Sequence, residues 1–123
     1  MFDKELAIEI LHQIYQATLS VLKRFEPINS STDFTNSEFG MEKLDSICMQ
    51  LIAIGESLKN LDKVTNNNLL KNYNEIDWKK VKGMRDIISH HYFDVDAEAI
   101  FDVCQNHIPE LNKTINKIIS ELS

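Results

Sequence analysis

The sequence LDSICMQLIAIGESLKNL, residues 44–61, repeats its apolar residues at every third or fourth position. That spacing places them on one face of a helix, and they are Leu44, Ile47, Cys48, Leu51, Ile54, Gly55, Leu58 and Leu61. The stretch therefore predicts a long amphipathic helix from about Glu38 to Leu61. Gly55 inside this helix costs roughly 1 kcal/mol relative to alanine, so we expect it to permit close approach of another backbone.

The sequence on both sides shows the same helical period. We predict helices over Asp3–Phe25, over Trp78 to about His91 after the N-cap Asp77, from the cap Asp96 to about Asn106, and from Pro109 to the C-terminus. Residues 62–75 are rich in asparagine and are predicted to form a loop or irregular turn. The fold class that follows is all-α, an antiparallel bundle of four to five helices in a single domain spanning 1–123.

Composition agrees with a small helical domain and limits its partners. The 123 residues are 43% apolar, with only three glycines and two prolines. The net charge of −6 argues against a domain-wide basic surface for nucleic acid, so DNA is not an expected partner. Cys48 and Cys104 occupy apolar-periodic positions and are predicted to be buried, reduced core residues. No apolar run approaches the length of a membrane span, and we expect a cytoplasmic protein.

Reactive side chains gather in MRDIISHHYF, residues 84–93. On a helix, Arg85, Ser89 and Tyr92 lie along one face, while Asp86 and His90 share a neighbouring one. The remaining circumference, Val81, Met84, Ile87 and Ile88, is predicted to be core. Arg85 and His90 are about 140° apart on an ideal helix. They can meet if the arginine wraps around, if the helix ends near His90, or if a second copy lies alongside, which implies a homodimer.

These residue types suit phosphate chemistry. Histidine acts as a general acid or base near neutral pH, and a guanidinium binds phosphate and stabilises the charge that develops on it. Together they suffice for RNA cleavage without a metal, and no metal or other cofactor is predicted. Across residues 78–92, four basic residues minus Asp86 give a net charge of +3, as a local phosphate-binding patch requires.

A structural interpretation stands beside the catalytic one. Arg85 could pair with an acidic residue on another helix, His90 could be a satisfied buried histidine, and Tyr92 a core aromatic. The adjacent His90 and His91 diverge by about 100° on a helix, so one ion would rarely be held by both.

The motif and its flanks resemble a known family. Arg85, four residues, His90, one residue and Tyr92 form the R-x4-H-x-Y signature of HepT-like toxins, a branch of the HEPN domains. The segments AIGESLKNL at 53–61 and IDWKKVKGMRDIISHHYF at 76–93 also look like the family's Ile-Gly-Glu and Trp…Gly-Met-Arg stretches. The resemblance covers at least residues 41–118.

The resemblance implies a small homodimeric helical ribonuclease that needs no metal. Arg85 and His90 of both chains would be catalytic at the dimer interface, Asp86 would position or polarise them, and Glu56 would line the same cleft. In this family a minimal nucleotidyltransferase antitoxin typically silences the toxin by attaching AMP groups to the motif tyrosine, here Tyr92. His91 inherits no role.

Two functions follow as hypotheses. The first is a toxin-type endoribonuclease that cuts single-stranded RNA, mRNA or tRNA, by transphosphorylation. The alternative is a non-catalytic nucleotide-binding or interaction subunit of a nucleotidyltransferase complex, in which the motif serves only as docking site and acceptor. The intact Arg85 and His90 favour the first. Neither hypothesis involves a membrane.

Overall fold

The computed structural model of this chain describes residues 2–90 and 95–123. Its α-helices are α1 (Lys4–Phe25), α2 (Glu38–Val64), α3 (Trp78–His90), α4 (Ala97–Asp102) and α5 (Ile108–Leu122). No strand occurs in the part of the chain that the structure describes. The all-α prediction is therefore confirmed, and α1 ends at the residue that the periodicity predicted.

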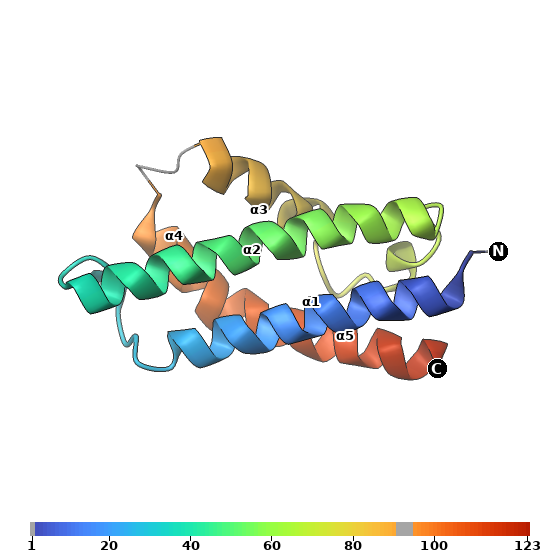
Figure 1. Cartoon of the computed structure of the whole chain (residues 1–123), viewed down its shortest axis with the longest axis horizontal. Helices are drawn as coiled ribbons and strands as arrows, with labels where there is room; N and C mark the ends of the chain where they lie inside the picture. The colour runs from blue at the N-terminus through green and yellow to red at the C-terminus, as the bar shows by residue number, and fades with distance from the viewer. Residues whose placement is uncertain (1, 91–94) are drawn as a thin grey trace.

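The helices form an up-down-up-down bundle (Figure 1). Helices α1 and α2 lie side by side and antiparallel, and α5 packs along α1. Helix α3 lies across the outer side of α2 and runs back against its direction. The start of α1 and the end of α5 lie at the same end of the bundle. This arrangement leaves α3 with one large neighbour, α2, and a broad outward face.

Short polar residues begin the helices as the sequence predicted for Asp96. The Asp3 carboxylate accepts a hydrogen bond from the Leu6 amide at 3.1 Å, and the Ser37 hydroxyl accepts one from the Gly40 amide at 3.0 Å. The Asp96 carboxylate accepts from the amides of Glu98 and Ala99. Each cap satisfies amide groups that have no partner within their own helix.

The core forms where the apolar faces of α1, α2 and α5 meet. Every member of the α2 stripe is buried, and so are the stripe residues Ala7, Leu11, Ile14, Thr18 and Val21 of α1 and Leu111, Ile115 and Ile118 of α5. Both cysteines are free and buried, as predicted. Burial raises the pKa of the Cys48 thiol to about 11 and that of Cys104 to about 12, so both stay protonated near neutral pH.

The connection between α1 and α2 contains a short 3-10 turn, η1 (Ser31–Phe34), within a segment that the sequence predicted only as polar. Phe34 of this turn is fully buried. Gly40 in the first turn of α2 makes room for it, because a Cβ there would lie 1.8 Å from the Asp33 carbonyl oxygen. A side chain at position 40 would therefore force η1 away from α2.

The asparagine-rich segment after α2 begins with a turn. Helix α2 continues to Val64, three residues beyond the predicted end, and Asn66 and Asn67 then adopt φ of 55° and 60°. Asparagine tolerates this left-handed backbone better than most residues. A second 3-10 turn, η2 (Leu70–Asn72), follows and buries Leu70 against the core.

The predicted break between the last two helices is wrong. A π-helical turn, η4 (Val103–His107), joins α4 to α5 without an intervening loop. Pro109 supplies a physical reason. It has no amide hydrogen to donate to the carbonyl of residue 105, and its ring clashes there, so the helix widens.

One core prediction on α3 is also wrong. Ile88 is 2% exposed and Val81 and Met84 pack partly buried against the core, but Ile87 is 64% exposed. Helix α3 contacts the bundle on one side only, so the residue next to Ile88 turns outward. No helix in the described part of the chain is long and apolar enough to cross a membrane.

Candidate functional site

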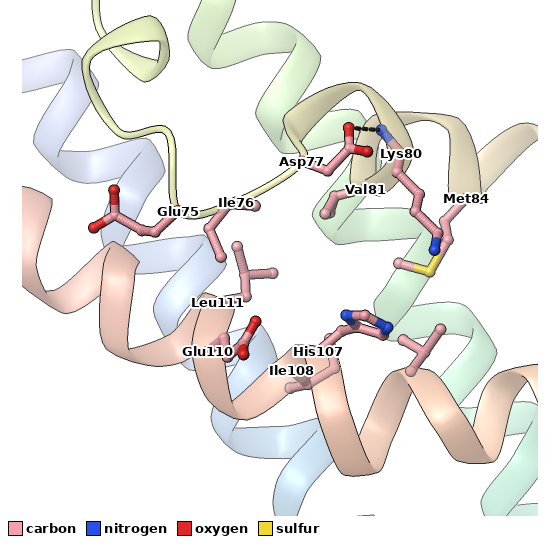
Figure 2. Close-up of a pocket in the computed structure, with 11 residues that line it drawn as sticks. Glu75, Ile76, Asp77, Lys80, Val81, Met84, His107, Ile108, Glu110 and Leu111 are labelled. Atoms are coloured by element: carbon pink, nitrogen blue, oxygen red, sulfur yellow. Dashed lines mark hydrogen bonds between the residues drawn. The ribbon is translucent and has the colours of Figure 1, made fainter.

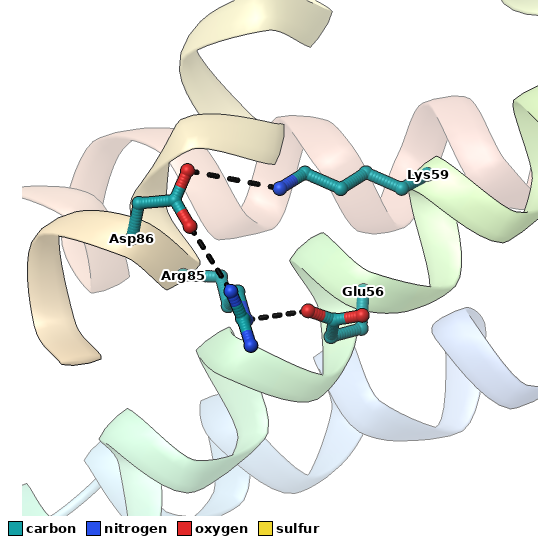
Figure 3. Close-up of polar contacts among 4 residues, drawn as sticks. All are labelled: Glu56, Lys59, Arg85 and Asp86. Atoms are coloured by element: carbon teal, nitrogen blue, oxygen red, sulfur yellow. Dashed lines mark hydrogen bonds and ion pairs between the residues drawn. The ribbon is translucent and has the colours of Figure 1, made fainter.

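Charged side chains face one another along the contact between α2 and α3. Going down α2, Glu56 pairs with Arg85, Lys59 with Asp86, and Asp62 with Lys82. Asp62, the last of the three on α2, pairs with Lys82, the first of the three on α3, as expected for two antiparallel helices. Glu56, Lys59, Arg85 and Asp86 form one connected group, which we call the Arg85 cluster (Figure 3).

Gly55 sets how closely the two helices approach at this cluster. A Cβ on Gly55 would lie 3.2 Å from the Arg85 Cβ and 3.3 Å from the Lys82 carbonyl oxygen. Both distances are shorter than ordinary van der Waals contact between carbon or oxygen atoms. The predicted close approach of another backbone at Gly55 is thus confirmed, and the approaching backbone is the segment of α3 that carries Arg85.

Arg85 is held on two sides. Its Nε atom is buried against the Glu56 carboxylate as an ion pair without an aligned hydrogen bond, and its Nη1 donates to the Asp86 carboxylate at 3.1 Å. The other oxygen of Asp86 lies 3.7 Å from the Lys59 Nζ. Even so, 42% of the Arg85 side chain is exposed. The guanidinium is therefore positioned by carboxylates and remains accessible to an anion from solvent.

The positive charge predicted over residues 78–92 is largely balanced in the structure. Lys82 pairs with Asp62 and Arg85 with Glu56, and both acidic partners come from α2. The sequence count missed them because they lie twenty or more positions away along the chain. Lys79 and Lys80 remain exposed. An anion that binds at Arg85 must therefore compete with the carboxylate of Glu56 for the guanidinium.

The structure brings together three of the five predicted site residues, Glu56, Arg85 and Asp86. His90 is the last residue of α3, and the helical register separates it from Arg85 by about 140°. Tyr92, the predicted acceptor of AMP, lies outside the described residues, as does His91. The structure shows how two carboxylates hold Arg85. The roles of His90 and Tyr92 stay predictions.

Lys59 is a member of the cluster that the sequence interpretation missed. It lies one helical turn beyond Glu56 on the same face of α2, so the Ile-Gly-Glu stretch contained a signal for it. An open hollow of about 420 Å³ lies beside it on α2, lined by Glu56, Ser57, Lys59, Asn60 and Lys63. Two residues of the cluster, Glu56 and Lys59, therefore line this hollow together with a second lysine, Lys63.

No group of three or more histidine, cysteine, aspartate or glutamate side chains in the described ranges is arranged to hold a metal ion. His107 is instead paired with Asp102, with 3.3 Å between its Nε2 and a carboxylate oxygen. That pair, and a side-chain hydrogen bond from Asn106 that contributes most, lower the pKa of the Asp102 carboxyl.

Comparison with known proteins gives a consistent result. The sequence profile of the family "Ribonuclease HepT-like" matches residues 14–118. In Methanocaldococcus jannaschii, "Putative RNase MJ0127" is 32% identical over 97 residues, which are 77% of each chain. "Probable ribonuclease HepT" of Thermococcus cleftensis is 30% identical over 59% of this chain and 63% of its own.

A longer relative matches through only part of its length. "Gamma-glutamylcyclotransferase and putative RNase MJ0434" of Methanocaldococcus jannaschii is 31% identical over 85% of this chain, which spans 44% of that protein. No solved structure matches significantly. The family profile covers most of the bundle, including α2, α3 and the Arg85 cluster. The chain therefore belongs to the HepT-like ribonuclease family.

Proposed function

We propose that this chain is the toxin of a toxin–antitoxin module and cuts single-stranded RNA, mRNA or tRNA, without a metal ion. The observation that carries the proposal is the Arg85 cluster. In a member of a ribonuclease family, it holds a partly exposed arginine side chain against two carboxylates. A preorganised cation of this kind stabilises the negative charge that develops on phosphate oxygens during cleavage.

The proposed reaction is transphosphorylation. The 2′-hydroxyl of the RNA attacks the adjacent phosphorus, a bond forms between the 2′-oxygen and phosphorus, and the bond to the 5′-oxygen breaks. The products are a 2′,3′-cyclic phosphate and a free 5′-hydroxyl. His90 takes the proton from the attacking hydroxyl and returns one to the leaving 5′-oxygen.

Arg85 binds the phosphate in this scheme, and its neighbours orient it. Nε and Nη1 face Glu56 and Asp86, so we assign Nη2 to the non-bridging phosphate oxygens. Guanidinium groups suit this task because their donors form a fixed planar fork. Asp86 and Glu56 act as positioning residues, since each contacts Arg85 and has no role of its own in the proton transfers.

We further propose that two chains form the site. Arg85 and His90 diverge on α3, and a two-fold axis beside α3 would bring one chain's histidine near the other chain's arginine. Exposed apolar side chains near the cluster support this proposal. Ile87 is 64% exposed, and Met49, two helical turns before Glu56 on the same face of α2, is 66% exposed.

A cleavage assay tests the nuclease. Wild type, Arg85→Ala and His90→Ala are purified without any partner and incubated with tRNA in EDTA. We expect wild type to give products with cyclic phosphate ends and His90→Ala to lose about 10²- to 10⁴-fold in rate. His12→Ala, at an exposed histidine of α1, serves as the matched control. Intact RNA with wild type, or equal cutting by His90→Ala, would refute the nuclease.

Silencing by a nucleotidyltransferase is the finer part of the proposal and rests on the family motif. The antitoxin would transfer AMP from ATP to the Tyr92 hydroxyl and release pyrophosphate. Co-expression with such a partner should raise the intact mass in AMP-sized steps, and Tyr92→Phe should abolish the increase. An unchanged mass in wild type, or an increase that survives Tyr92→Phe, would exclude this regulation.

A further inference from the structure

A second recess is lined in part by α3, and none of the residues of the Arg85 cluster lines it (Figure 2). It has a volume of about 260 Å³ and is enclosed by the segment 75–77, by the first half of α3 and by the junction of η4 with α5. Met84 of α3 contributes to its wall, and the next residue along the chain is Arg85. The recess is therefore separate from the cluster but built on the same turn of the same helix.

The inner surface of this recess is apolar. Ile76, Ile108 and Leu111 form it and are all less than 10% exposed, while Val81 and Met84 add partly buried walls. The volume is just below the range of about 300–1,000 Å³ that is typical of pockets for drug-sized ligands. A single flat ring system with apolar faces matches this size and surface better than a larger molecule does.

The rim of the recess carries charged side chains. Glu75 is paired with Lys117 at 3.1 Å, and Asp77 caps α3 through the Lys80 amide. The side chains of Lys80 and Glu110 also line the recess, and neither has an ion pair among residues 2–90 and 95–123. Lys80 can thus donate and Glu110 can accept a hydrogen bond at the opening, and Lys80 also helps to lower the pKa of the Asp102 carboxyl, to a smaller extent than the Asn106 hydrogen bond.

His107 adds a third polar group at a backbone feature that often marks functional sites. It is the last residue of the π-helical turn η4, and such turns occur frequently at sites of function. Asp102 occupies its Nε2, and the imidazole points toward the Lys80 and Met84 side of the recess (Figure 2). The widened turn thus places His107 among the residues that line the recess.

We propose that this recess binds one nucleobase of the RNA strand. A base has two apolar faces and an edge that carries both hydrogen-bond donors and acceptors. A carboxylate such as Glu110 accepts from an exocyclic amino group, and a lysine such as Lys80 donates to a ring nitrogen or carbonyl oxygen. A purely anionic ligand would be repelled by Glu110, and a purely apolar ligand would leave both charges unused.

This inference rests on the proposed nuclease and extends it to substrate choice. Met84 and Arg85 diverge by about 100° on α3, so a single strand with its phosphate at Arg85 has to pass around α3 to place a base against Met84. The recess then selects a base near the cleaved bond. Lys80 and Glu110 are base-binding residues in this scheme and take no part in bond breaking.

Methionine methyl groups provide a direct test on the whole chain. Isotope-labelled methyl signals are recorded in His90→Ala during titration with each of the four ribonucleoside monophosphates, with ribose 5-phosphate and with short single-stranded RNAs. We expect the Met84 signal to shift with at least one mononucleotide and not with ribose 5-phosphate, while the exposed Met41 and Met49 stay unchanged. No Met84 shift, or the same shift with ribose 5-phosphate, would overturn the proposal.

Matched variants assign the contact residues. Glu110→Gln and Lys80→Ala should each weaken the binding seen at Met84 by about tenfold, the loss of one charged hydrogen bond. Lys79→Ala removes the same charge from the adjacent exposed position, which does not line the recess, and should have no effect. Equal weakening of binding by Lys79→Ala would show that the loss reflects the overall positive charge and not a contact in the recess. That result would refute the assignment.

Two further outcomes separate this inference from the nuclease. If the chain fails to cut RNA but Met84 responds to bases, the nuclease fails and the base site stands. If wild type cuts RNA and Met84 does not respond, the base site fails alone. A short RNA should bind more tightly than its own mononucleotides, and equal affinities would overturn the assignment of the occupant to an RNA strand.

Discussion

Arg85 is held by carboxylates from two different helices. Asp86 follows it in the sequence, while Glu56 comes from α2 and faces the Nε atom. Because both contacts are partly exposed, solvent screens them and each contributes little to stability. Their effect falls instead on the direction of the guanidinium, which decides whether its free edge can reach a phosphate.

Replacing Glu56 with glutamine tests this positioning role. The change keeps the size of the side chain and removes the charge that faces Nε. We expect the rate of RNA cleavage to fall about tenfold because Arg85 samples more orientations, while the free energy of unfolding changes by less than about 1 kcal/mol. Single-turnover cleavage and urea unfolding measure the two quantities.

Glu42→Gln is the matched control for Glu56→Gln, because Glu42 is an exposed glutamate on the same helix that has no contact with Arg85. It should leave cleavage unchanged. If Glu56→Gln cuts RNA faster than wild type, Glu56 blocks Arg85 from the phosphate, and the positioning role is wrong.

Helices α2 and α3 approach each other closely at Gly55, whereas Gly83 of α3 has open space beside it. A Cβ on Gly55 would press on Arg85 and on the Lys82 carbonyl, whereas a Cβ on Gly83 would meet nothing within 4 Å. Both glycines lie inside helices and cost roughly 1 kcal/mol relative to alanine. Alanine substitutions at these two positions therefore separate the effect of helix propensity on stability from the effect of close packing.

Gly55→Ala should destabilise the chain although alanine favours a helix. The gain in propensity is about 1 kcal/mol, and forcing a methyl group against a neighbouring backbone costs about 1–3 kcal/mol. We expect a net loss of about 1 kcal/mol in urea unfolding, together with slower RNA cleavage because α3 moves away from Glu56. Gly83→Ala should instead stabilise by up to about 1 kcal/mol. Equal stabilisation by both variants would contradict the close contact.

The junction of α4 and α5 shows where a local rule fails. A proline often follows the end of one helix and begins the next, so Pro109 predicted a break. The structure keeps the helix continuous through η4 and absorbs the proline by widening one turn. Cys104 within η4 and Ile108 directly after it are both buried, and a connecting loop would disrupt that burial.

At the scale of the whole molecule, α3 lies on the outside of the bundle and only one of its sides is covered. Ile87 consequently projects into solvent beside the helix that carries Arg85. An isolated exposed isoleucine is unremarkable in itself. Ile87 is connected to the proposed dimer because it lies near Arg85 on α3, which in the proposed site works with the histidine of a second chain.

Ile87→Glu should dissociate that dimer, because it places a charge in the proposed apolar contact. Sedimentation equilibrium should give a mass near twice 14.2 kDa for wild type and near 14.2 kDa for the variant, with RNA cleavage lost in parallel. Leu19→Glu introduces the same charge at an exposed leucine of α1 and should remain dimeric and active. A monomeric wild type that cleaves RNA would refute the two-chain site.

The helices, most of the core and the motif could be predicted from the amino-acid sequence. Helical period, caps and turn residues are local properties, so α1, α2 and α3 and the buried stripe of α2 could be predicted from residues a few positions apart. The candidates Arg85, Asp86 and Glu56 came from the motif and its flanks. The sequence also predicted close approach at Gly55 from the stability that a glycine costs inside a helix, although Gly83 carries the same cost without such a contact.

Which charged side chains form pairs follows from the tertiary structure and could not be predicted from the sequence. The pairing of Arg85 with Glu56, of Asp86 with Lys59 and of Lys82 with Asp62 depends on the register of two antiparallel helices. Likewise, the outward position of Ile87 and the recess beside Met84 depend on which side of α3 the bundle covers. These contacts join residues far apart in the chain, and their geometry follows from packing of whole helices, which no local pattern encodes.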